Sequence, residues 1–110
     1  MGHAMDAVKR LLWWLIAGSV GGVNRARIIQ KLKERPCNAN QLTEALKLDY
    51  KTVRHHIEVL EKNNLVTSTG QKYSKMYFLS TLLEENFSSF SEIWAQIGKN
   101  DLKGKKDRGD

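Results

Sequence analysis

The stretch that decides the fold is residues 38–66, NANQLTEALKLDYKTVRHHIEVLEKNNLV. Asn38 is followed three residues later by Gln41, a capping-box pattern in which each side chain satisfies a free backbone amide of a first helical turn. The pattern predicts a helix over residues 39–46. The apolar side of this helix consists of Leu42, Ala45 and Leu46.

A second helix is expected directly after it. Residues 47–48 make a brief connection to Asp49, a good N-cap, and the helix runs over residues 50–63. At about 100° per residue, the inward side consists of Val53, Ile57 and Leu60, with His56 at its margin. The outward side consists of Lys51, Arg54, His55, Glu58 and Lys62. Two short helices joined this tightly predict a helix-turn-helix.

Two more helices are expected upstream. The first begins after its N-cap Asp6, extends to about Ala17 and carries an apolar stripe of Val8, Leu11, Leu12, Leu15 and Ile16. The second covers residues 25–35, with Asn24 as its cap and Pro36 as its stop, because a residue before proline disfavours the α region. Its inward residues are Ile28, Ile29 and Leu32, and its solvent-exposed residues are Arg25, Arg27, Lys31 and Lys33.

Downstream, the pattern changes to strands and then returns to helix. Residues 65–69 and 75–79 are rich in β-branched and aromatic side chains, and the loop between them begins with Gly70, which predicts a hairpin. A final helix is expected from an apolar seam at alternating steps of four and three, made of Leu83, Phe87, Phe90, Trp94 and Ile97.

This order predicts a mainly α fold with a small β-hairpin, namely a winged helix-turn-helix with extra amino- and carboxy-terminal helices that form a dimer interface. A chain of 110 residues suits one domain. We expect residues 1–4 to be a tag remnant, residues 5–98 to form the domain, and residues 99–110 to be a flexible polar tail.

Positive charge is concentrated in the middle of the chain. Residues 23–79 contain eleven Lys and Arg against five Asp and Glu, a balance of +6 that equals the net charge of the whole chain. Such a local excess suits a polyanion, because neutralising phosphates releases condensed counterions. The alternative is a basic surface that only keeps the protein soluble.

The leading edge of the helix at residues 50–63 has the side chains that a major groove accepts. It comprises Tyr50, Lys51, Thr52, Arg54 and His55. Arg54 can donate two hydrogen bonds to a guanine, Thr52 can contact a thymine methyl or a phosphate, and Lys51 suits a phosphate. His55 can donate to a base or a phosphate, or it is an exposed residue without a function. We assign His56 to packing.

The hairpin tip is the second candidate DNA contact. The residues expected to reach a neighbouring backbone or minor groove are Gln71, Lys72, Tyr73 and Lys75. Two cations and an aromatic ring on a protruding loop favour this interpretation, and a solvated turn is the alternative.

The helix-turn-helix segment and the strand after it resemble a known family. The run from Asn40 to Leu46, and then from Asp49 to Val66 with its double histidine and V-L-E-K-x-x-L-V stretch, is similar to the ArsR-type winged-helix repressors, especially archaeal members. The resemblance covers about half of the chain. It implies a homodimer joined through the first and last helices, with two recognition helices on a pseudo-palindromic operator of double-stranded DNA.

Many relatives in that family sense metals, and here the sequence departs from them. The family's cysteine pair would fall at Asn38 and Asn40, and no histidine follows His56 for a site on the last helix. We therefore expect no metal and no cofactor. Cys37 lies beside the lost pair, where it is either a redox or ligand contact or, more simply, a small buried side chain.

The terminal helices are expected to form the dimer interface. Their aromatic content exceeds what a small monomer can easily bury, and aromatic residues are enriched in interfaces. The residues assigned to the interface are Leu11, Trp13, Trp14, Leu15, Leu83, Phe87, Phe90, Trp94 and Ile97. The alternative is that one terminal helix packs on the other within a single subunit.

Three other functions are alternatives to DNA binding. An enzyme needs converging catalytic groups or an open metal site, and no such set occurs, so we expect no enzymatic activity. A winged helix that binds protein or structured RNA shares the fold. Residues 11–23 are uncharged but too short for a span of about 20 residues, which leaves attachment to a membrane surface. A lone cysteine and no secretory signal favour the cytoplasm.

Overall fold

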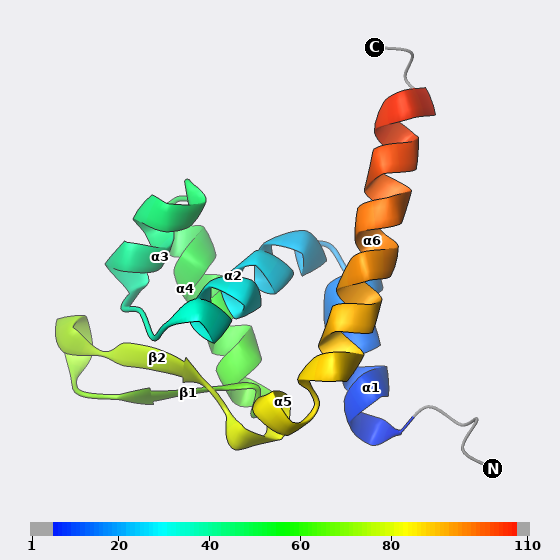
Figure 1. Ribbon diagram of the computed structural model, residues 1–110. Helices are drawn as coiled ribbons and strands as arrows, with labels where there is room; N and C mark the ends of the chain where they lie inside the picture. Colours follow the sequence, from blue (N-terminus) through cyan, green and yellow to red (C-terminus); the bar gives the residue numbers. More distant parts are fainter. Residues whose placement is uncertain (1–5, 108–110) are drawn as a thin grey trace.

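The computed structural model describes residues 6–107, apart from the side chains of Tyr73 and of residues 99–107 (Figure 1). In chain order the elements are α1 (Ala7–Leu12), the π-helical η1 (Trp13–Ala17), α2 (Gly22–Glu34), α3 (Ala39–Leu46), α4 (Tyr50–Lys62), β1 (Val66–Thr69), the 3-10 turn η2 (Lys72–Ser74), β2 (Met76–Leu79), α5 (Thr81–Glu85) and α6 (Phe87–Asp107). The expected fold class is confirmed, and the expected tag remnant lies outside the described residues.

Local capping fixes the helix-turn-helix as the sequence predicts. The side chain of Asn38 accepts a hydrogen bond from the Gln41 amide at 2.7 Å, and the Gln41 side chain accepts one from the Asn38 amide at 2.8 Å. Asp49 accepts from the amide of Thr52 at 3.2 Å and opens α4. One detail of α3 differs, because Ala39 is buried whereas Ala45 is exposed.

The start of α2 differs from the prediction. The helix begins at Gly22, after Gly21 at φ +88°, rather than after Asn24. Glycine adopts the left-handed backbone conformation without steric cost. The turn therefore depends on Gly21 and not on a side-chain cap. Asn24 lies inside the first turn, where its side-chain oxygen accepts from Arg27 Nη1 at 3.1 Å.

The first helix has the expected extent, from its cap Asp6 to Ala17, but its last turn widens into the π-helix η1. The backbone of α2 lies directly against that turn. A Cβ placed on Gly22 would be 1.8 Å from the carbonyl oxygen of Ile16, whereas ordinary contact begins near 3.4 Å. The absence of a side chain at Gly22 therefore permits the close approach of the two helices.

The expected hairpin is confirmed. Strands β1 and β2 pair antiparallel, with Val66 opposite Leu79 and Thr69 opposite Met76. The chain before α3 adds a short bridge to β2, since the amide of Tyr77 donates to the Cys37 carbonyl at 2.8 Å. The hairpin is thereby attached at its base to the segment that precedes the helix-turn-helix.

The terminal helices pack on one another inside the subunit (Figure 1). Lys9 Nζ and Glu92 Oε1 are 2.7 Å apart and link α1 to α6. The expected last helix is divided at Asn86 into α5 and α6. Leu83 and Phe90 are fully buried in the core, together with Ile93, which the expected seam omitted.

Helix α6 continues to Asp107, into the stretch where the sequence predicted a polar tail from Lys99. The sequence lacks apolar periodicity there, and helix propagation from a well-packed first half accounts for the extension. Among the described residues, no helix combines the length and the apolar character that a membrane span requires.

Candidate nucleic-acid interface

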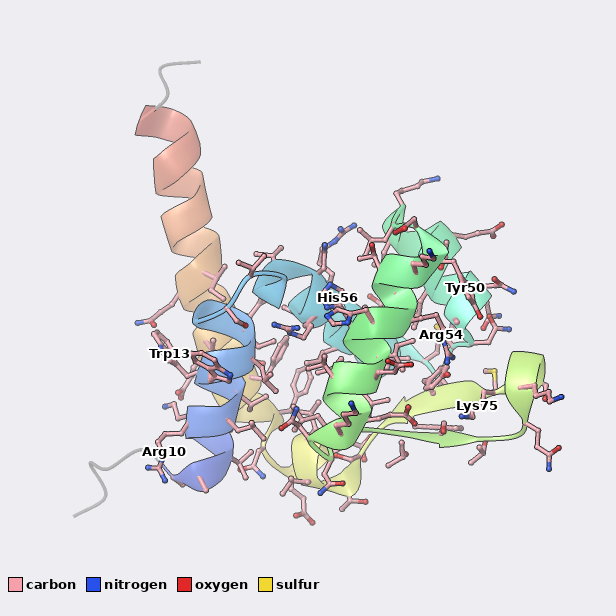
Figure 2. All side chains as sticks on the ribbon, turned by 180° about the vertical axis from the view of Figure 1, so that it is seen from behind. Arg10, Trp13, Tyr50, Arg54, His56 and Lys75 are labelled. Atoms are coloured by element: carbon pink, nitrogen blue, oxygen red, sulfur yellow. The ribbon has the colours of Figure 1, made fainter. Side chains whose placement is uncertain are left out.

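The outward side of α4 is available to a partner, as its helical periodicity predicts. Lys51, His55, Glu58 and Lys62 are exposed, whereas Val53, His56, Ile57 and Leu60 are buried. Thr52 and Arg54 are half-buried, and Tyr50 is 42% exposed at the start of the helix. Figure 2 shows this helix in front, with Tyr50 and Arg54 along it. The face that was expected to meet a double helix is therefore open.

Arg54 is held toward the hairpin rather than free at the surface. Its Nη1 donates to the hydroxyl of Tyr77 on β2 at 2.8 Å. Its Nη2 lies 4.0 Å from a carboxylate oxygen of Glu58, one turn further along the same helix. The side chain of Arg54 is 36% exposed. One terminal nitrogen of the guanidinium thus has a short hydrogen bond, and the other has only a long contact with a carboxylate.

A cleft separates the start of α4 from the hairpin tip. It has a volume of about 470 Å³ and is lined by Tyr50, Arg54, Lys72 and Lys75. A second, much smaller pocket of about 10 Å³ shares these four residues and is also lined by Ala39, Asn40 and Tyr77. The hairpin brings two of its predicted DNA contacts, Lys72 and Lys75, to the same cleft as two residues of α4. Figure 2 marks Lys75, Tyr50 and Arg54.

The other two hairpin residues are placed differently. Gln71 is exposed at the tip, outside the lining of this cleft. Its carbonyl accepts from the amide and the hydroxyl of Ser74, which closes the 3-10 turn. The side chain of Tyr73 lies outside the described part of the structure.

Tyr77 is a site residue that the sequence reasoning missed. It is 1% exposed, and its burial raises the pKa of its hydroxyl, so the group is neutral at physiological pH. Strand alternation places Tyr77 on the inward side of β2, which the sequence could have suggested. That its hydroxyl would meet Arg54 depends on how α4 packs on the hairpin, and no local pattern encodes it.

Arg25 was expected at the surface, and this expectation is wrong. The residue is 5% exposed. Its Nε donates to the Leu15 carbonyl at 3.0 Å, and its Nη2 donates to Ser19 Oγ at 2.7 Å and to the Val20 carbonyl at 3.1 Å. The carbonyls of Leu15 and Val20 lie at and beyond the end of η1, where backbone oxygens lack helical partners, and a planar guanidinium satisfies several acceptors at once.

Arg25 also connects the amino-terminal helices to α4. Its Nη1 lies 3.4 Å from Nδ1 of His56, and because arginine can only donate, the contact suits a neutral imidazole. His56 is 6% exposed, which agrees with the packing role assigned to it. Among the other cations of α2, Arg27 and Lys31 are half-buried and Lys33 is exposed.

The burial of His56 predicts a pH dependence of stability. Desolvation, with smaller contributions from Arg25 and His55, lowers the pKa of His56 from its ordinary 6.5. The unfolded chain then binds this proton more tightly than the folded one, so the stabilisation is complete above pH 6.5 and is lost as the pH falls through the lower folded pKa. Urea unfolding measured between about pH 7.5 and 5 should show this decline.

The variant His56→Gln should lose this part of the pH dependence. His55→Gln, which changes the exposed neighbouring histidine, serves as the control and should retain it. Asp49, whose pKa is lowered by hydrogen bonds from Thr52, titrates below its ordinary 3.8 and so outside this window. An equal effect of both histidine variants would contradict the assignment to His56.

Metal ligands do not gather anywhere in the described part of the chain, where no group of three His, Cys, Asp or Glu is close enough to hold an ion. Cys37 is buried with a free thiol. Its sulfur lies 3.5 Å from the carbonyl oxygen of Arg35, and its backbone pairs with β2. The structure thus gives Cys37 a packing position at the base of the hairpin.

The residues expected at a dimer interface fall into three sets. Leu15, Leu83 and Phe90 are buried within the subunit, so they cannot present a surface to a second copy in this conformation. Trp13 and Trp14 are 42% and 62% exposed. The half-buried members are Leu11, Phe87, Trp94 and Ile97. Trp13 lies on the side of the molecule away from the hairpin (Figure 2).

The helix-turn-helix segment is similar to a described sequence family over somewhat less than half of the chain. Residues 22–68 match the family "Bacterial regulatory protein, arsR family". This range covers α2, α3, α4 and most of β1. No curated protein sequence matches the chain.

Solved structures share the fold. The chain is similar to the transcriptional regulator HlyU from Vibrio vulnificus (TM-score 0.58, 16% identity, 84% of this chain and 88% of that one). It is also similar to a probable transcriptional regulator from Pseudomonas aeruginosa (TM-score 0.57, 21% identity, 92% of this chain and 87% of that one). Against MarR from Staphylococcus aureus the TM-score is 0.56 at 14% identity, over 76% of this chain and 57% of the MarR chain. The chain therefore has the winged helix-turn-helix fold of such regulators.

Proposed function

We propose that this protein is a transcription regulator that binds double-stranded DNA sequence-specifically as a homodimer, and that it acts as a repressor in the cytoplasm. The observation that carries the proposal is the open cationic face of α4, with Lys51 and His55 exposed beside a hairpin that supplies Lys72 and Lys75. The match of residues 22–68 to the arsR family supports it.

In this proposal, α4 is the recognition helix. A major groove admits one α-helix, whose amino-terminal residues meet base edges while flanking cations contact phosphates. Thr52 and His55 are placed for base contacts, and Lys51 for a phosphate. The hairpin, through Gln71 and its two lysines, reaches the adjacent backbone or minor groove as a wing.

The homodimer is supported by apolar surface on the amino-terminal helices. Besides the two tryptophans of η1, Val20 is 99% exposed and Val23 is 50% exposed. Contiguous exposed apolar patches mark contact surfaces, and these four side chains come from one stretch of the chain, residues 13–23. A second copy that covers them places two recognition helices on one duplex.

Selection from a random pool of duplexes tests the proposal. A twofold-symmetric protein should enrich inverted repeats, with half-site centres about 10 base pairs apart or a multiple of that distance. The variant Thr52→Ala, His55→Ala should enrich a different or weaker motif, and Lys33→Ala, at an exposed position of α2, should enrich the same one as the unaltered protein.

Three results would contradict parts of this proposal. Enrichment without any shared motif would mean that base sequence is not recognised. Enrichment of single half-sites would exclude the homodimer on DNA. Stronger retention of structured RNA than of any duplex would favour the RNA-binding alternative.

A further inference from the structure

The cleft between α4 and the hairpin has the composition of an anion site. Of its four lining residues, Arg54, Lys72 and Lys75 are cationic and none is acidic. The nearest acid recorded for Arg54 is Glu58 at 4.0 Å, a distance at which an exposed ion pair contributes little. A phosphate offers more charge and more acceptor oxygens than this carboxylate, and arginine matches its geometry.

Tyr77 sets the direction of Arg54. Its buried ring is fixed in β2 by the bridge to Cys37, and its hydroxyl accepts from Arg54 Nη1. The guanidinium is therefore held toward β2, where Arg54 lines the cleft. Having accepted this bond, the neutral hydroxyl keeps its own proton as a donor in the small pocket that Tyr77 shares with Arg54, Lys72 and Lys75.

The position of the cleft indicates which phosphate of the duplex would bind there. If α4 lies in a major groove and the hairpin reaches the adjacent minor groove or backbone, then the junction between them crosses the sugar–phosphate strand that separates the grooves. The lining residues come from both elements, Tyr50 and Arg54 from α4 and two lysines from the hairpin.

We propose that this cleft binds one backbone phosphate of duplex DNA, with Arg54 as the central ligand and Tyr77 as the positioning residue that directs Arg54 to the phosphate instead of a guanine. This inference rests on the proposed DNA-binding function. It replaces the base contact expected for Arg54 from the sequence and gives Tyr77 a role beyond packing.

A double-mutant cycle on a mixed-sequence duplex tests it. Arg54→Ala should weaken binding to all duplexes alike and reduce the slope of log affinity against log salt by about 1. Tyr77→Phe, which keeps the ring and every charge, should weaken binding about five- to tenfold, since the hydrogen bond it removes involves a charged group. In the Arg54→Ala background, Tyr77→Phe should have no further effect.

Lys33→Ala serves as the charge-matched control, because Lys33 Nζ lies over the Phe87 ring at 4.8 Å and Lys33 does not line the cleft. It should leave the salt slope unchanged. Thermal unfolding of Tyr77→Phe verifies that the variant folds. Titration with inorganic phosphate at constant ionic strength provides a second arm, in which weak binding is expected.

Each failure has a separate meaning. Wild-type affinity for Tyr77→Phe, or equal losses from Tyr77→Phe with and without Arg54, overturns the positioning role. If Arg54→Ala loses preference at one base pair and leaves the salt slope unchanged, Arg54 contacts a base and not a phosphate. Tight binding of free phosphate assigns the cleft to a small anion. Failure of the unaltered protein to bind any duplex at low salt would instead refute the proposed function.

Discussion

Gly22→Ala is expected to destabilise the protein severely, by about 3 kcal/mol or more, or to prevent folding. In an ordinary helix the same change stabilises by up to about 1 kcal/mol, because alanine has the higher helix propensity. Here the new Cβ would be 1.8 Å from the Ile16 carbonyl oxygen and 2.6 Å from its carbon. The obstacle is backbone, so η1 and α2 must move apart and disturb the contacts of Arg25.

The matched control is Gly98→Ala in α6, where a Cβ would meet nothing within 4 Å. That variant should be slightly more stable than the unaltered protein, in line with propensity alone. Urea unfolding followed by far-ultraviolet circular dichroism measures both. Equal stability of Gly22→Ala and the unaltered protein would mean that the first helix does not approach α2 as closely as described.

The second large effect is expected on DNA binding. Reversing two charges on the proposed interface, Lys51→Glu with Lys72→Glu, should weaken duplex binding at least about a hundredfold, because two phosphate contacts become repulsions in every subunit. Fluorescence anisotropy of a labelled duplex measures it. The control pair, Lys31→Glu with Lys33→Glu, has the same net charge but lies on α2, on the opposite side from α4 (Figures 1 and 2).

How much of the fold the sequence predicts depends on how local each determinant is. Asn38 and Gln41 satisfy each other within one turn, and Asp49 caps α4 the same way, so the helix-turn-helix was predicted almost to the residue. The start of α2 was not, because it depends on Gly21 at positive φ and on contact with η1. Asn24 has the chemistry of a cap, but the tertiary contact decides where the helix begins.

The same distinction applies to the candidate site. The outward side of α4 follows from its periodicity, and Lys51 and His55 are exposed as predicted. The partners of Arg25 and Arg54 could not be predicted, since each guanidinium binds groups from a distant element, namely the Leu15 carbonyl and the Tyr77 hydroxyl. A long cationic side chain in a helical pattern looks solvent-exposed unless the oxygens that would satisfy it are known.

The central claim is that the face formed by α4 and the hairpin binds the phosphates and bases of a duplex. Titration of a labelled duplex with the unaltered protein and the two charge-reversed pairs, at salt concentrations between about 50 and 200 mM, tests it most directly. The account predicts that affinity falls about a hundredfold or more over this range, that the Lys51 and Lys72 pair binds weakly throughout, and that the α2 pair resembles the unaltered protein. Negligible affinity at the lowest salt, or equal loss from both pairs, would contradict it.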